Sequence, residues 1–184
     1  MTAPSKLVAR AFAKVNLGLE VLGKRDDGYH ELRTILQTVD LYDELSFRRE
    51  TERISLTTND PDLGTGPENL VYRAASLLAE KASTPGLGAS IHLDKRVPAG
   101  MGLGGGSADA AAALGLMADR FGLDGEVMRE LAEALGSDVP FCLVGGSADV
   151  GGVGDVGRHR GRRGRVGFAH VFFPDAKTWL ARDW

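Results

Sequence analysis

A glycine-rich segment that runs directly into an alanine-rich one constrains this chain more than any other feature. Residues 98–115 read PAGMGLGGGSADAAAALG, and the part that follows Gly106 predicts a helix to about residue 121. Glycine loses more conformational freedom on folding than any other residue, and Ser, Thr or Asp normally suffices before a helix. The segment therefore predicts that a ligand approaches the backbone closely, with a phosphate at the helix N-terminus as the leading candidate.

Two common phosphate-binding patterns fit the segment poorly. A Walker loop requires a lysine after its last glycine, and none is present. The dinucleotide pattern GxGxxG matches at Gly100, Gly102 and Gly105, but residues 90–99 alternate in polarity and end in Pro-Ala instead of forming a buried parallel strand. A flexible linker is disfavoured by the strongly helical sequence that follows. An anion-binding nest at the positive end of a helix is the interpretation we keep.

The remaining segments predict an α+β fold. Residues 11–21 alternate between apolar and polar side chains, as in a half-buried strand, with Lys14 and Asn16 together on the polar face. Strands precede the helices and the helices interleave later, which favours α+β over a regular βαβ array. Further strands are expected at 31–41, 43–50, 53–58 and 90–97, and helices at 68–82, 106–121, 125–135 and from Ser137, with Ser137 or Asp138 as N-cap.

Composition bounds the class of protein. The 184 residues suffice for one main core, and 22 basic against 25 acidic residues give a net charge of −3, which provides no general attraction for nucleic acid or anionic membranes. Cys142 is the single cysteine, so an internal disulfide is excluded. The first twelve residues lack the apolar stretch of a signal peptide, and we expect a cytoplasmic protein without a membrane span.

The character of the chain changes near its end. Residues 149–184 are rich in glycine, show no apolar period and include five arginines between Arg158 and Arg165. We expect a domain at 1–148 and a disordered Gly/Arg-rich tail at 149–184.

Three motifs together identify a family. AKVNLGLEVLGKRDDGYHEL (13–32), PAGMGLGGGSADAAAAL (98–114) and GSDVPF (136–141) occur in an order and spacing that resemble the 4-diphosphocytidyl-2-C-methyl-D-erythritol kinases of the GHMP kinase superfamily. The resemblance implies a GHMP kinase N-terminal domain of the ribosomal protein S5 domain 2-like type. It also implies ATP-dependent phosphorylation of the 2-hydroxyl of a cytidine-diphosphate-linked methylerythritol, a step of non-mevalonate isoprenoid synthesis.

The resemblance also assigns roles to residues. It implies that Asp138 is the catalytic base and Lys14 the neighbouring cation, which would favour the charged form of that carboxylate. Asn16 would hold the methylerythritol, and Tyr29 and His30 the cytidine. The ATP-binding residues would be Pro98, Ala99, Gly100, Met101, Gly102, Leu103, Gly104, Gly105, Gly106, Ser107 and Ala108. ATP is expected as its Mg²⁺ complex, without a metal-binding residue of the protein's own.

The match to the family pattern stops near residue 148, where family members continue into a ferredoxin-like C-terminal domain. We therefore expect a truncated or frame-shifted chain from which that domain is missing. Two other functions stay open: an inactive remnant of such a kinase, and a nucleic-acid-binding protein that uses the arginine-rich tail.

Overall fold

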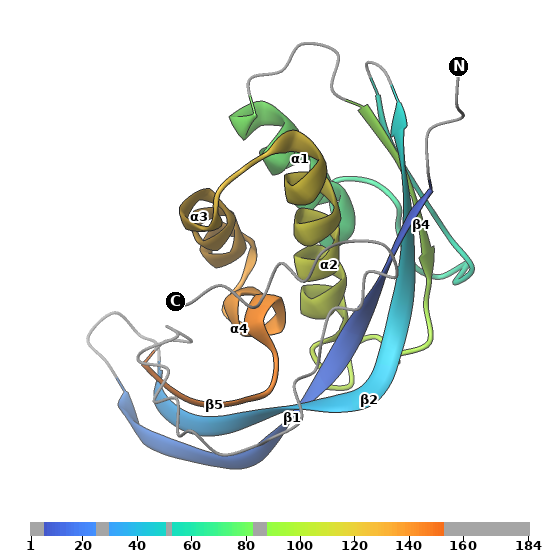
Figure 1. Cartoon of the computed structure of the whole chain (residues 1–184). Helices are drawn as coiled ribbons and strands as arrows, with labels where there is room; N and C mark the ends of the chain where they lie inside the picture. The colour runs from blue at the N-terminus through green and yellow to red at the C-terminus, as the bar shows by residue number, and fades with distance from the viewer. Residues whose placement is uncertain (1–5, 25–29, 51–52, 83–87, 153–184) are drawn as a thin grey trace.

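The protein, described here by a computed structural model, is built on a curved sheet with helices packed on one of its faces (Figure 1). The structure describes residues 6–24, 30–50, 53–82 and 88–152. Within these ranges the elements are, in chain order, β1 (Leu7–Lys24), β2 (His30–Glu50), β3 (Ile54–Thr58), α1 (Leu70–Lys81), β4 (Gly88–Asp94), α2 (Gly105–Phe121), α3 (Gly125–Leu135), α4 (Val139–Val144) and β5 (Ser147–Gly152).

Strand β2 organises the sheet. It pairs antiparallel with β1 on one side, and on the other side with β5 at residues 32–37 and with β4 at residues 44–50. Strand β3 joins the edge of β4 in parallel, which gives the order β1-β2-β4-β3. The expected α+β class is confirmed. The prediction of separate strands at 31–41 and 43–50 was wrong, because β2 continues through both segments as one strand.

The alternation of buried and exposed side chains breaks along β1. Its pairing with β2 shifts register between Phe12 and Lys14 and again between Asn16 and Gly18. At the first shift the extra residues lie in β2, where residues 39–41 lie opposite Ala13, and at the second shift the extra residue is Leu17 of β1. Ala11 and Ala13 are buried as predicted, but Leu17 is 65% exposed, and the expectation of one apolar face along 11–21 was wrong. Lys14 is buried directly after Ala13, so strict alternation fails at the first shift.

Helix α2 lies at the centre of the helical layer. It packs against α1, α3, α4 and β1, and its residues Ala110–Ala113 are almost fully buried. Side-chain caps fix the starts of two neighbouring helices: Asn69 accepts a hydrogen bond from Val71 N, and Asp124 accepts one from Val127 N. The four predicted helices are confirmed, with bounds shifted by a few residues at most.

The end of the domain lies later than the sequence predicts. Ala148 and Val150 of β5 are buried against Leu36 and Phe141, and the pairing of β5 with β2 continues to Gly152. The predicted boundary after residue 148 therefore falls inside a strand. The predicted tail beyond residue 152, with its arginines, lies outside the described residues. Every helix in the described ranges is too short or too polar to cross a membrane.

Removing β5 should destabilise the domain. A chain ending after Gly146 loses the burial of Val150 and uncovers Leu36 and Phe141, so its free energy of unfolding in urea should fall by about 2–4 kcal/mol. A chain ending after Gly152 is the matched control and should unfold like the 184-residue chain. Equal midpoints for the two shortened chains would contradict the role given to β5.

Candidate functional site

The glycine segment forms a loop whose backbone only glycine adopts without strain. Gly100, Gly102 and Gly104 have φ of 73°, 73° and 67°, the left-handed region that side chains disfavour. Gly104 is the N-cap of α2 and makes no side-chain cap bond. The N–H groups in the first turn of a helix have no partner within the helix, so those of α2 point their positive ends toward the loop. This backbone has the form expected of an anion-binding nest.

The loop lies directly on β1. Lys14 N donates a hydrogen bond to Leu103 O at 2.8 Å. A Cβ atom placed on Gly104 would come within 2.8 Å of Cγ and 2.9 Å of Cε of Lys14. The absence of a side chain at Gly104 therefore lets the loop pack against the aliphatic part of Lys14.

The Lys14 ammonium contacts two other residues singled out from the sequence, Asp138 and Asn16. Its Nζ lies 3.2 Å from Asp138 Oδ2 and donates to Asn16 Oδ1 at 2.9 Å. Asn16 Nδ2 in turn donates to Thr34 Oγ1 at 2.8 Å, which fixes the orientation of the amide. The Lys14 side chain is 9% exposed and that of Asp138 is 34% exposed. The buried Lys14 ammonium, fixed by its hydrogen bond to Asn16, thus lies beside an Asp138 carboxylate that solvent or a ligand can reach.

Asp138 does not act as a side-chain cap. It occupies the N-cap position of α4, but its side chain makes no capping hydrogen bond and is directed to Lys14 instead. Pro140 lies in the first turn, as expected. The structure thus brings Asp138 and Lys14 together as neighbours, the arrangement that the family resemblance implied.

Two residues of the predicted ATP-binding set have other tasks. The φ of Gly105 is not in the left-handed region, and a Cβ atom there would come within 2.9 Å of both Lys95 Nζ and Val97 Cγ1. Its glycine is therefore required by the protein's own packing. Ala108 is 3% exposed and donates its N–H to Gly104 O, so its amide is already used within the helix and its place among the ATP-binding residues stays a prediction. Sequence reasoning also missed Lys95, whose position gives no periodic signal.

The structure does not describe the side chains of the two residues expected to hold cytidine. Tyr29 lies outside the described residues. Of His30 only the backbone is described, as the first residue of β2 opposite Lys24.

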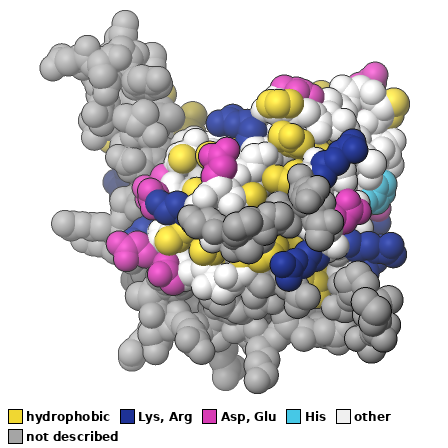
Figure 2. All heavy atoms as spheres, turned by 90° about the horizontal axis from the view of Figure 1, so that it is seen from above, with side chains coloured by type: hydrophobic (Ala, Val, Ile, Leu, Met, Phe, Trp, Pro, Cys, Tyr) yellow, Lys and Arg dark blue, Asp and Glu magenta, His cyan; other side chains and the backbone are white. Residues whose placement is uncertain are grey.

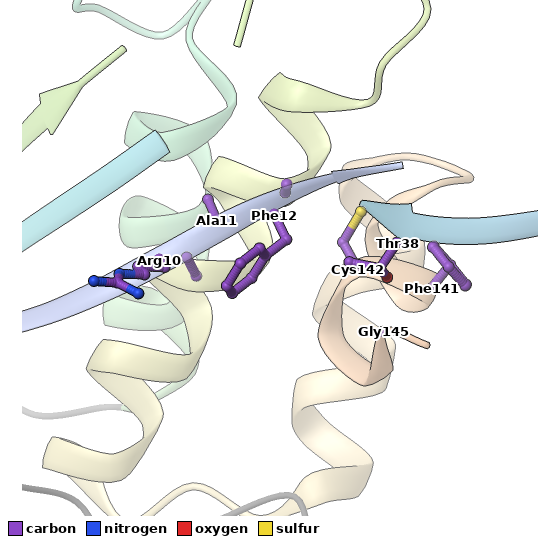
Figure 3. A pocket seen from close by; sticks show the side chains of 9 residues that line it. Arg10, Ala11, Phe12, Thr38, Phe141, Cys142 and Gly145 are labelled. Carbon is purple, nitrogen blue, oxygen red and sulfur yellow. The ribbon is translucent and has the colours of Figure 1, made fainter. Parts of the chain in front are cut away.

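A small pocket lies next to the ion pair without including it. Figure 3 shows lining residues from β1, β2 and α4, and two alanines of α2 complete the lining. Its lining is Arg10, Ala11, Phe12, Thr38, Ala108, Ala112, Phe141, Cys142 and Gly145. Burial, together with the nearby Asp138 carboxylate, raises the pKa of the Cys142 thiol to about 12. Cys142 is therefore a packing residue and a poor nucleophile near neutral pH.

The described residues form no cluster of acidic metal ligands, and the face in Figure 2 does not carry one sign of charge. On the face in Figure 2 acidic and basic side chains are interspersed. Within the described ranges, no group of three or more His, Cys, Asp or Glu side chains could hold a metal ion.

A glycine loop at an uncapped helix start, beside a lysine–aspartate pair, suits phosphoryl transfer, which depends on positioning and on charge stabilisation. Residues 69–146 match the family model of the GHMP kinases N terminal domain. The α+β unit described here is a GHMP kinase N-terminal domain.

The particular relatives are 4-diphosphocytidyl-2-C-methyl-D-erythritol kinases, which confirms the resemblance drawn from the three motifs. The enzyme of Pelotomaculum thermopropionicum is 51% identical over 152 residues, covering 81% of this chain and 53% of the relative. That of Synechococcus sp. (strain CC9605) is 49% identical over 143 residues, covering 76% and 47%. The chain thus spans about half the length of the curated relatives that it matches.

Comparison with solved structures gives the same relatives and the same fold. The crystal structure of a 4-(cytidine 5'-diphospho)-2C-methyl-D-erythritol kinase superposes with a TM-score of 0.68 at 46% identity, covering 80% of this chain and 53% of that one. A mevalonate kinase superposes with a TM-score of 0.61 at 16% identity and shares the fold. These relatives do not favour the nucleic-acid alternative.

Alkylation should show the protected state of Cys142. With its pKa near 12, the native thiol should react with iodoacetamide at pH 8 at least ~100-fold more slowly than the same cysteine in denaturing urea, because the thiolate is the reactive form. Mass spectrometry of timed samples measures both rates. Similar rates in the two states would contradict the burial of this thiol.

Proposed function

We propose that the chain provides the ATP-binding half of a kinase that phosphorylates the 2-hydroxyl of 4-(cytidine 5'-diphospho)-2-C-methyl-D-erythritol in non-mevalonate isoprenoid synthesis. The observation that carries the proposal is the Lys14–Asp138 pair, 3.2 Å apart, at the edge of the glycine loop. The names of its relatives support the substrate.

In this proposal the loop from Pro98 to Ser107 holds the phosphates of ATP. The amides at the start of α2 donate to phosphate oxygens, and the helix dipole favours their negative charge. Mg²⁺ would enter bound to the ATP phosphates, since the described residues offer no cluster of three acidic ligands for it.

Asp138 would accept the proton of the substrate. The 2-hydroxyl oxygen forms a bond to the γ-phosphorus, the bond from that phosphorus to the β,γ-bridging oxygen breaks, and ADP leaves with that electron pair. The hydroxyl proton passes to Asp138 Oδ. Lys14, already within 3.2 Å of that carboxylate, would stabilise the negative charge on the transferring group.

Asn16 would orient the sugar alcohol. Its Oδ1 accepts from Lys14 and its Nδ2 donates to Thr34, so the amide is fixed before substrate arrives. Tyr29 and His30 remain predictions for the cytidine.

Alanine substitutions at Gly104 and Gly100 should distinguish the packing of the loop against Lys14 from backbone strain alone. Gly104→Ala adds a side chain where φ is 67° and where Lys14 leaves no space, whereas Gly100→Ala is strained by φ alone. The dissociation constant for ATP, measured by calorimetry, should rise by ~100-fold in Gly104→Ala and by less than ~10-fold in Gly100→Ala. Equal affinities in the two variants would contradict the contact between loop and Lys14.

Loss of the base should reduce turnover and spare nucleotide binding. Asp138→Asn keeps the size of the side chain and removes its ability to accept a proton, so turnover should fall by about 10²–10⁴-fold with ATP affinity nearly unchanged. Coupled detection of ADP measures the rate. Turnover within a few-fold of the parent would leave Asp138 as a structural partner of Lys14 alone.

The experiment that tests the function titrates ATP and the cytidine substrate separately. The 184-residue chain is compared with the same residues 1–152 joined to the C-terminal half of a relative. ATP binding by both proteins, and phosphate transfer by at least the joined one, is the expected result. No ATP binding by either would overturn the proposal.

A further inference from the structure

A second buried lysine lies beneath the glycine loop, and the proposed chemistry gives it no task. The Lys95 side chain is 5% exposed and donates to Asp43 Oδ2 and, at 2.9 Å, to Asp109 Oδ2. Asp43 is fully buried on β2, and Asp109 lies on α2 with 2% of its side chain exposed. Three ionisable groups from different parts of the sequence are therefore enclosed together, which is costly unless each is well paired.

Asp43 holds the chain just before the loop. Its Oδ1 accepts hydrogen bonds from Arg96 N at 2.5 Å and from Val97 N at 2.7 Å. From the other side, Asn59 Oδ1 accepts from Lys95 N at 2.7 Å. The backbone at residues 95–97 is thus clamped between β2 and the end of β3, immediately ahead of Pro98.

Asp109 holds the chain just after the loop. It lies four residues beyond Gly105 on α2, one helical turn away and on the same face. Gly105 itself packs on Lys95, since a Cβ atom there would come within 2.9 Å of Nζ. The single ammonium of Lys95 is therefore bonded to Asp43, which anchors one end of the loop, and to Asp109, which anchors the other.

We propose that Lys95 is a positioning residue, which ties both ends of the 98–104 loop through Asp43 and Asp109 and so holds its backbone in the form that receives ATP phosphates. The inference rests on the proposed function for the identity of the ligand, although the tie itself exists without any ligand. Holding a loop in its bound form raises affinity because less freedom is lost on binding.

The protonation state of Asp109 decides which substitutions at this position are informative. Burial, opposed by the charge of Lys95 and assisted by that of Asp43, raises the pKa of Asp109 to about 8, so the neutral acid predominates at pH 7. Among the described residues its Oδ1 has no hydrogen-bond partner. Asparagine therefore imitates the neutral form of Asp109 and can still accept a bond from Lys95, while leucine cannot.

The first test measures hydrogen exchange without nucleotide. Loop exchange is read at the amides of Lys14 and Ala108, which donate to Leu103 O and Gly104 O of the loop. In Lys95→Met these two amides should exchange at least ~10-fold faster than in the parent at pH 7, with α1 unchanged, because the loop opens locally while the core stays intact. Arg96→Met is the matched control: its exposed guanidinium pairs with Asp94 on the surface, so loop exchange should stay at the parent rate. Unchanged loop exchange in Lys95→Met would overturn the proposal.

The second test compares Asp109→Leu with Asp109→Asn, so that the outcome does not depend on the folding of Lys95→Met. Asp109→Leu should speed loop exchange and raise the dissociation constant for ATP by ~10-fold, and Asp109→Asn should restore both toward the parent. Equal behaviour of the two would overturn the inference. If the parent binds no ATP, the proposed function fails, and the exchange rates still decide whether Lys95 holds the loop.

Discussion

The site depends on two consecutive glycines that rest on two lysine side chains. Gly104 packs against Lys14 from β1, and Gly105 against Lys95 at the end of β4. Each lysine is in turn held by carboxylates, Lys14 by Asp138 and Lys95 by Asp43 and Asp109. The start of α2 can therefore approach the sheet only because neither position carries a side chain.

This contact connects the fold to the proposed chemistry. At the register shift around Ala13 both Ala13 and Lys14 are buried, and α4 brings Asp138 to Lys14. Strict alternation after Ala13 would leave Lys14 on the opposite face, away from both the loop and the carboxylate. A local irregularity in one strand thus decides whether the proposed base and its cation meet.

Sequence patterns predicted the helices, the α+β class and the loop, because apolar periods and glycine spacing are local signals. They did not predict the continuity of β2 or the exposure of Leu17, which depend on bulges set by pairing across the sheet. Asp43 and Lys95 are separated by 52 residues, so their bond gives no local signal. The resemblance to a family singled out Lys14 and Asp138, whereas the packing of Gly105 on Lys95 was not predicted.

The alanines of α2 have a consequence for how still the loop is. Residues Ala110–Ala113 fill the layer between the sheet and the other helices, and each is at most 3% exposed. Alanine has no rotamers to lose on folding and none to exchange afterwards. Rearrangement of these four side chains therefore cannot absorb thermal motion of the first half of α2, which favours movement of this half together with the sheet. The loop begins where this half of the helix begins, so the ties at its two ends act on a support that has few ways to yield.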